Sequence, residues 1–161
     1  MCDSIIGIDP GLKGGIAYIS KDFCWVSDMP KTALEVAYYL HSDIKADCVV
    51  VEKVHALPGQ SCKSNFTFGM SYQTALVLSA MLSSKTELVT PQEWKKYFGL
   101  KREEGETKAQ FKKKSVDLAR ELFPGLAKYL LYSKDGRAEA LLIAEYYRRT
   151  HHKEWTHSSI G

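Results

Sequence analysis

Four carboxylates stand at positions where a folded chain does not usually leave a charge. Asp9 ends the short apolar segment IIGID and is followed by a glycine-containing turn. Glu52 ends a second apolar segment, CVVVE, while Asp135 and Glu139 open a segment that is otherwise apolar. Burying a carboxylate is costly, so each of them needs a hydrogen bond, a positive partner or a metal ion.

Converging carboxylates of this kind suit a metal-dependent reaction. Three or four of them cannot all ionise together unless a positive charge joins them. A divalent cation removes the repulsion, and ligands that are all oxygen favour Mg²⁺ or Mn²⁺. Two such ions would activate water and stabilise a leaving oxygen in phosphodiester hydrolysis.

Each carboxylate also has a simpler interpretation. Asp9 could cap a turn, Asp135 could be a helix N-cap, Glu52 could pair with a lysine, and Glu139 could be exposed. Their joint placement at the ends of predicted elements favours the metal site over four separate explanations.

The elements that must position these acids can be predicted from the same sequence. Three apolar segments separated by tight turns indicate an antiparallel meander of strands, over 5–9, 15–20 and 23–27. A helix over 32–41, opened by Pro30, follows the meander, and a buried strand over 48–52 comes next.

The second half of the chain predicts mostly helices. After a largely apolar helix over 68–82 and a short strand over 87–90, Thr90, Pro91 and Glu93 are typical of a capped helix start. Two more helices follow, over 107–123 and 134–149.

This order predicts an α/β fold with a central, mixed, five-stranded sheet, three antiparallel strands and then parallel ones, flanked by helices. If the strands that end at Asp9 and Glu52 are parallel neighbours, both acids lie at one edge of the sheet. Asp135 and Glu139 are four residues apart and share a helix face.

Composition and charge are those of an ordinary globular chain. Its 161 residues are 45% hydrophobic and 25% charged, so we expect one domain over 1–150 and a short tail over 151–161. No apolar run could span a bilayer, the N-terminus lacks a signal-peptide pattern, and the four cysteines form no CxxC pair. We therefore expect reduced, intracellular thiols.

The net charge of +3 is unevenly distributed. The segment KREEGETKAQFKKK, over 101–114, holds six positive and three negative side chains. A local positive surface suits a polyanion such as nucleic acid, although a solvated helix face would have the same composition.

Three motifs together resemble one known family. IIGIDPGLKGGIAYI resembles the first motif of the RuvC family of Holliday junction resolvases, especially its small phage-type members. VVVEKVHALPGQSCKSNFTFG resembles the second motif, in which an acid ends a strand before a DNA-contacting loop. KDGRAEALLIAEY resembles the final motif, a pair of acids that opens the last helix. The resemblance covers nearly the whole chain, from Ile5 to about Arg149.

The resemblance implies a ribonuclease H-like fold, Mg²⁺-dependent cleavage of four-way DNA junctions, and a homodimer that nicks two strands. The metal ligands it implies for two Mg²⁺ ions, with Mn²⁺ as a substitute, are Asp9, Glu52, Asp135 and Glu139. The chain departs from the family at its last two acids. They are four residues apart rather than three, Gly136 occupies the three-apart position, and a glutamate stands at 139 where aspartate is usual.

The resemblance also implies residues that contact DNA. A catalytic lysine is expected in the basic segment, where Lys108 and Lys114 are equal candidates. The stacking aromatic of bacterial members is replaced by His55, and Phe66 or Phe68 could stack instead or pack in the core. The positions expected to touch DNA are Lys13, Lys53, His55, Lys63, Phe66, Lys112 and Lys113.

Partners and rival functions follow from the same comparison. The helix over 72–82 is apolar on most faces, so it is either a buried core helix or a seam between two subunits. We expect a cytoplasmic protein, in a bacterial cell or a phage-infected host, with four-way or branched DNA as partner and no membrane or nucleotide cofactor. The rivals are a broader nuclease for branched DNA or flaps and a catalytically inactive junction-binding module. A phosphotransferase of the sugar-kinase and actin type would need a longer, two-domain chain.

Overall fold

The computed structural model describes residues 2–54, 59 and 61–152. Its strands are β1 (Ser4–Asp9), β2 (Gly15–Ser20), β3 (Cys24–Asp28), β4 (Cys48–Glu52) and β5 (Thr86–Val89). They form one sheet in the order β3-β2-β1-β4-β5. The first three strands pair antiparallel, and β4 lies parallel to both β1 and β5. The predicted meander followed by parallel strands is confirmed, with strand ends that differ from the prediction by one residue at most.

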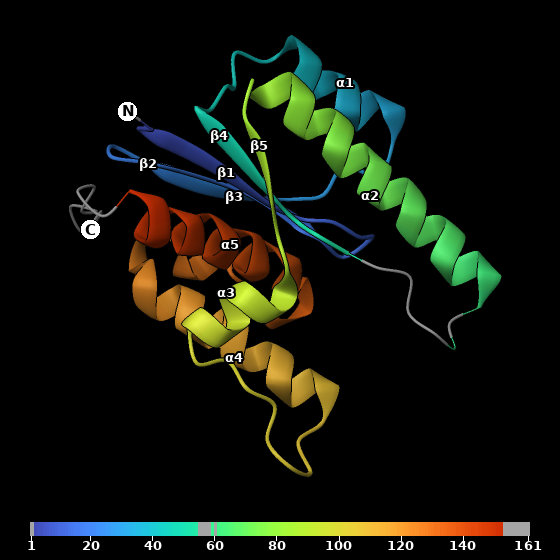
Figure 1. Cartoon of the computed structure of the whole chain (residues 1–161), viewed down its shortest axis with the longest axis vertical. Coiled ribbons are helices and arrows are strands. Elements are labelled where there is room, and N and C mark those ends of the chain that lie inside the picture. Colours follow the sequence, from blue (N-terminus) through green and yellow to red (C-terminus); the bar gives the residue numbers. More distant parts are fainter. Residues whose placement is uncertain (1, 55–58, 60, 153–161) are drawn as a thin grey trace.

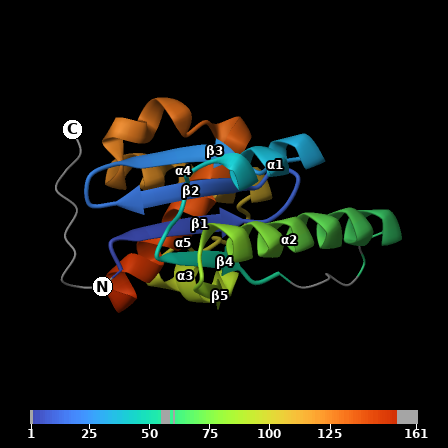
Figure 2. The same ribbon diagram turned by 90° about the horizontal axis from the view of Figure 1, so that it is seen from above.

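Helices cover both faces of this sheet (Figure 1). They are α1 (Ala33–His41), α2 (Cys62–Leu82), α3 (Pro91–Tyr97), α4 (Lys108–Leu122) and α5 (Asp135–His151), with short 3₁₀ helices at Pro124–Tyr129 and Tyr132–Lys134. α1 and α2 lie side by side on one face, and α3, α4 and α5 lie on the other (Figures 1 and 2). The sheet is therefore the middle of three layers.

The alternation of side chains along the central strands decides which way the strand-end acids face. Ile6 and Ile8 of β1 belong to the core under α1 and α2, whereas Ile5 belongs to the core under α5. In β4, Val49 and Val51 face α2, while Cys48 and Val50 face α5. By the same two-residue period, Asp9 and Glu52 project on the α5 face.

Glycines let α5 approach the sheet closely enough to bring its acids to that edge. A Cβ atom at Gly7 would lie 2.1 Å from the Ala140 carbonyl oxygen. At the start of α5, Gly136 forms a bridge with Gly14, and a Cβ on Gly136 would lie 2.2 Å from the Lys13 carbonyl oxygen. Only glycine fits these contacts, which explains why position 136 carries no carboxylate.

The predicted start of α2 is wrong. The helix begins at Cys62 rather than Phe68, because Ser61 caps it by accepting a hydrogen bond from the Ser64 N–H. Along the helix, Phe66, Met70 and Val77 are 71%, 58% and 41% exposed, whereas Ala75, Leu78 and Leu82 are buried. Helix α2 covers the sheet with one face and leaves the other open, so its apolar residues do not all reach a core.

The other helix starts follow their caps. Thr90 and Glu93 form the predicted capping box of α3, with Pro91 at the first turn. α1 begins after Thr32, which forms its own capping box with Glu35, so Pro30 lies just before the helix rather than in its first turn. The four cysteines are free thiols. Within the described parts of the chain, no helix has the length and apolarity that a membrane span needs.

Candidate active site

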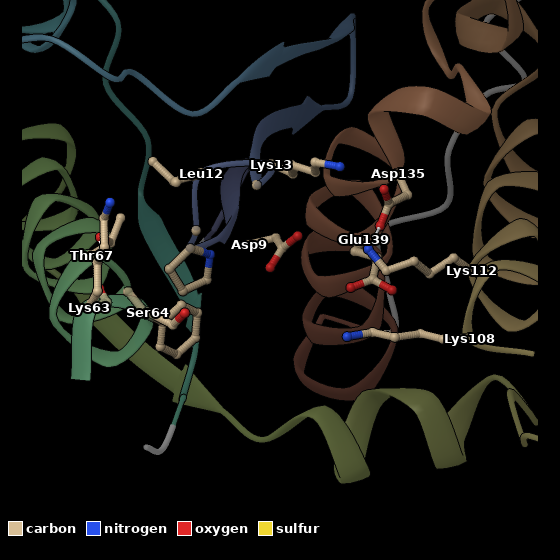
Figure 3. Close-up of a pocket in the computed structure, with 14 residues that line it drawn as sticks. Asp9, Leu12, Lys13, Lys63, Ser64, Thr67, Lys108, Lys112, Asp135 and Glu139 are labelled. Atoms are coloured by element: carbon tan, nitrogen blue, oxygen red, sulfur yellow. Dashed lines mark hydrogen bonds and ion pairs between the residues drawn. The ribbon is translucent and has the colours of Figure 1, made fainter. Parts of the chain in front are cut away.

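The four acids gather at one end of the sheet. The parallel register pairs Ile8 of β1 with Val51 of β4, so Asp9 and Glu52, one residue further along, end adjacent strands. Asp135 and Glu139 lie one turn apart at the start of α5, with only 7% and 9% of their surfaces exposed. In Figure 3 the Asp9 side chain points toward Glu139 and Asp135. The fold thus brings together residues from three distant parts of the sequence.

The negative charges of these acids repel one another, and burial together with this repulsion shifts the pKa of Asp9. Burial raises the pKa of Asp9 well above its ordinary value, and the negative charges of Glu139, Glu52 and Asp135 raise it further, with partial relief from Lys95. Perturbed titration of this kind is typical of a functional site, since a fold gains no stability from confining like charges.

Glu52 is held by a specific partner on α3. The indole Nε1 of Trp94 donates a hydrogen bond of 2.8 Å to Glu52 Oε1, and both side chains are buried. Burial raises the pKa of Glu52, the Trp94 hydrogen bond lowers it in part, and the Glu139 charge raises it. A glutamate can therefore end this core strand because a neutral donor satisfies one oxygen, while the other accepts no hydrogen bond from residues 2–54, 59 or 61–152.

Lysines supply part of the positive charge that the acids need. Lys112 of α4 forms an ion pair with Asp135, and Lys95 of α3 lies 3.5 Å from Glu139. The Ser115 hydroxyl also donates to Glu139, at 3.4 Å. These two ion pairs alone do not balance the charge of four ionised acids.

The donor chemistry of this cluster fits a hard divalent cation. All four acids offer carboxylate oxygen, the ligand that Mg²⁺ and Mn²⁺ favour, and their repulsion is the kind that such an ion relieves. In the described conformation, and within residues 2–54, 59 and 61–152, no three His, Cys, Asp or Glu side chains converge closely enough to form a ready-made metal-binding group.

A cavity of about 550 Å³ opens beside the acids (Figure 3). Asp9, Asp135 and Glu139 line it together with lysines from the β1–β2 turn, α2 and α4, namely Lys13, Lys63, Lys108 and Lys112. Phe68, Ser64 and Thr67 of α2 line the same cavity. It therefore places carboxylates, which can bind a cation, next to ammonium groups, which can bind an anion.

The structure separates the two candidate catalytic lysines. Lys108 lines the cavity and has no acidic partner among the described residues. Lys114 lies outside it, where its ammonium pairs with Glu106 at 3.0 Å and donates to the Lys101 carbonyl. This arrangement favours Lys108 as the lysine that meets substrate.

Other predicted DNA contacts lie outside the cavity lining. The Lys113 ammonium sits over the Tyr132 ring, 5.6 Å from its centroid. Lys53 is exposed just after β4, and its backbone N–H donates to the Val89 carbonyl. Phe66 projects into solvent from the second turn of α2. His55 falls outside the described residues.

Sequence reasoning missed three residues that touch the acids: Trp94, Lys95 and Ser115. The segment TPQEWKK gave a strong signal for a capped helix start, which accounted for its residues without any role at the site. The contact between Trp94 and Glu52 spans 42 positions, so no local spacing could reveal it. A buried tryptophan needs a hydrogen-bond acceptor, and that requirement was the only available signal.

Solved structures similar in fold to this chain include Holliday junction resolvases. T. thermophilus RuvC in complex with Holliday junction substrate is 17% identical, with a TM-score of 0.55 over 92% of this chain and 96% of that one. The crystal structure of the fowlpox virus Holliday junction resolvase is 18% identical, with a TM-score of 0.55 over 91% and 98%. A second T. thermophilus RuvC structure is 18% identical, with a TM-score of 0.52 over 91% and 96%.

These similarities confirm the predicted ribonuclease H-like fold over nearly the whole chain. At 17–18% identity they are similarities of fold. No family model matches the sequence, and no curated protein matches it either.

Proposed function

We propose that this protein is a metal-dependent, structure-selective endodeoxyribonuclease that resolves four-way DNA junctions by paired nicks. The observation that carries the proposal is the gathering of Asp9, Glu52, Asp135 and Glu139 beside a cavity lined by lysines. The fold shared with T. thermophilus RuvC, which was solved with a Holliday junction substrate, supports the four-way junction as the substrate class.

The four acids would hold two Mg²⁺ ions, for which Mn²⁺ would substitute. When bound there, the ions would supply an activated water and neutralise charge on the phosphodiester. The chain's own contribution is orientation: Trp94 fixes one oxygen of Glu52, and Ser115 fixes one oxygen of Glu139. Lys112 and Lys95 limit repulsion among the acids until the ions arrive.

The lysines of the cavity would bind and orient the DNA strand. Lys108, which has no acidic partner among the described residues, would contact the scissile phosphate. Lys13 and Lys63 would contact phosphates from the β1–β2 turn and from α2. In the hydrolysis, a bond forms between a water oxygen and phosphorus, and the bond from phosphorus to the 3′ oxygen breaks. The products are a 5′-phosphate and a 3′-hydroxyl, ends that a ligase can join.

A homodimer would supply the second nick. The exposed residues Phe66, Met70 and Val77 stand four and seven residues apart along α2, which puts them in one stripe of the helix. Such a stripe is typical of a surface that packs against another helix. We propose that α2 of one subunit packs on α2 of the other, so that two acidic sites act on one junction. The location we propose for this dimer is the cytoplasm.

A cleavage assay tests this function. A mobile four-way junction, a linear duplex and a flap of matched sequence are incubated with Mg²⁺ or EDTA, using the wild type and Glu52→Gln. We expect paired nicks in the junction alone, lost in EDTA and in the variant. Equal cutting of junctions and flaps would favour the broader nuclease. Tight junction binding without cutting would favour the inactive binding module and contradict the proposal.

A further inference from the structure

A second cavity, of about 630 Å³, lies between α3 and the segment that follows it. Four of its lining residues are cations, Lys95, Lys96, Lys101 and Arg102, and its described lining includes no acid. We call it the α3 groove. None of the residues expected individually to touch DNA lies in it, although Lys101 and Arg102 begin the basic segment over 101–114.

The α3 groove is continuous with the acidic site through Lys95. The Lys95 ammonium lies 3.5 Å from Glu139 Oε1 and 4.8 Å from the centroid of the Trp94 ring, while the same residue lines the groove. Glu139 in turn lines the first cavity. A DNA strand with a phosphate at the acids would therefore have the lysine-lined cavity on one side of Glu139 and the α3 groove next to Lys95.

The far wall of the α3 groove is a loop held by its own hydrogen bonds. Lys114 donates to the Lys101 carbonyl at 3.1 Å and pairs with Glu106 at 3.0 Å. Arg102 Nε donates to the Glu106 carbonyl at 2.8 Å. Gly105 makes the turn, with a φ of 77° that a glycine adopts easily. These contacts fix the backbone that presents Lys101 and Arg102 to the groove.

Two of the groove's cations are not used inside the protein. Lys96 and Lys101 are exposed, and neither side chain has an acidic partner among residues 2–54, 59 and 61–152. A fixed scaffold that presents unpaired ammonium groups is suited to phosphate oxygens, which bind lysine without regard to base sequence.

We propose that the α3 groove binds the sugar-phosphate backbone of the DNA that flanks the cleaved bond, with Lys96 and Lys101 each contacting a phosphate. This inference rests on the proposed function, since it takes DNA as the substrate. Lys114 then acts as a positioning residue that holds the loop rather than as a group that meets the scissile phosphate.

The test measures affinity for a four-way junction and for a linear duplex of matched sequence against salt, by fluorescence anisotropy in EDTA, where no cleavage interferes. The wild type is compared with the double variant Lys96→Gln/Lys101→Gln. The control is Lys21→Gln/Lys45→Gln, which removes the same charge from the far end of the sheet, in the β2–β3 turn and in the segment before β4. Thermal unfolding of each protein establishes that it is folded.

Each phosphate contact adds about 0.9 to the slope of log K against log salt. The groove variant should therefore have a slope smaller in magnitude by about 1.8 than the wild type. When salt rises from about 50 to 200 mM, the factor by which the variant loses affinity should be about twelve times smaller than the factor for the wild type. The control variant should keep the wild-type slope.

Three results overturn the proposal. If the groove variant keeps the wild-type slope and affinity, the α3 groove does not bind DNA, while the proposed function stands. If the groove and control variants lose equal slope, the effect is one of net charge and not of the groove. If the wild type itself binds the junction no better than duplex, the proposed function fails and this inference fails with it.

Discussion

Replacing Trp94 with Phe removes the indole N–H that donates to Glu52 while keeping an aromatic ring in the core. Trp94 is fully buried, and its Nε1 lies 2.8 Å from Glu52 Oε1. If Glu52 is a metal ligand, this hydrogen bond orients it, and the variant should bind divalent ions more weakly. If Trp94 only fills space, metal affinity should not change.

The magnitude follows from the kind of hydrogen bond. A bond to a charged acceptor contributes about 1.5–3 kcal/mol, and each 1.4 kcal/mol corresponds to about a tenfold change in affinity. We expect Trp94→Phe to weaken Mn²⁺ binding by about 10–100-fold, the range found when residues that orient metal ligands are removed. The smaller ring also leaves a void, which should lower the free energy of unfolding by about 1–3 kcal/mol.

The pH dependence gives the same prediction a second readout. Burial raises the pKa of Glu52, and the Trp94 hydrogen bond counteracts that rise. Without the indole donor, the pKa of Glu52 should rise further, and Mn²⁺ binding should begin at a higher pH than in the wild type. A loss of packing alone would not shift this pH profile.

The assay is isothermal titration calorimetry with Mn²⁺ over a series of pH values, with thermal unfolding in parallel. The matched control is Tyr39→Phe, which removes the hydroxyl of a buried tyrosine on the opposite face of the sheet. It should keep wild-type Mn²⁺ affinity. A Trp94→Phe protein with reduced stability but an Mn²⁺ affinity within about twofold of wild type would refute the reasoning.

Three further predictions concern stability. In EDTA, Asp9→Asn should raise the free energy of unfolding by about 1–2 kcal/mol, because it removes a buried charge that neighbouring acids repel. Urea titration measures this change, and a lower free energy of unfolding would contradict the prediction. Gly136→Ala should lower the free energy of unfolding by about 3 kcal/mol or more, since its Cβ would meet backbone. The control Gly69→Ala has open space around it and should not destabilise α2. If the two variants had equal melting temperatures, the close contact at Gly136 would be refuted. Burial raises the pKa of Glu145, but hydrogen bonds from Arg148 and Arg149 bring that pKa below its ordinary value. The contribution of ionised Glu145 to the free energy of unfolding is therefore present above the unfolded pKa of about 4.3, and it is lost as the pH falls through the lower folded pKa. Glu145→Gln should therefore cost about 2–3 kcal/mol at neutral pH, and a cost that did not shrink in acid would contradict this sign.

The local signals in the sequence predicted most of the fold. β2 and β4 were predicted with their observed bounds because each is a β-branched or apolar run bounded by turn or polar residues. The start of α3 was predicted from Thr90, Pro91 and Glu93, which act within one turn. The placement of Asp9 and Glu52 followed from parallel strands that end at one edge.

What the sequence did not predict depends on contacts between distant residues or on exposed helix faces. The first turns of α2 carry Phe66 and Thr67 without an apolar period, so Ser61 was not recognised as a cap. Lys108 and Lys114 differ only in their partners, since Lys114 is held by Glu106. The close contact of Gly136, between Asp135 and Glu139, with the β1–β2 turn joins residues about 120 positions apart, so no local spacing reveals it.

The measurement that tests the central claim most directly uses a supercoiled plasmid carrying an extruded cruciform, incubated with the wild type and with Asp9→Asn. Paired nicks across one four-way junction convert the plasmid to a linear product, whereas a single nick relaxes it to an open circle. The account predicts a linear product in Mg²⁺, absent in EDTA and absent with Asp9→Asn. Binding of the cruciform without cleavage, or a wild-type product that is only an open circle, would contradict it.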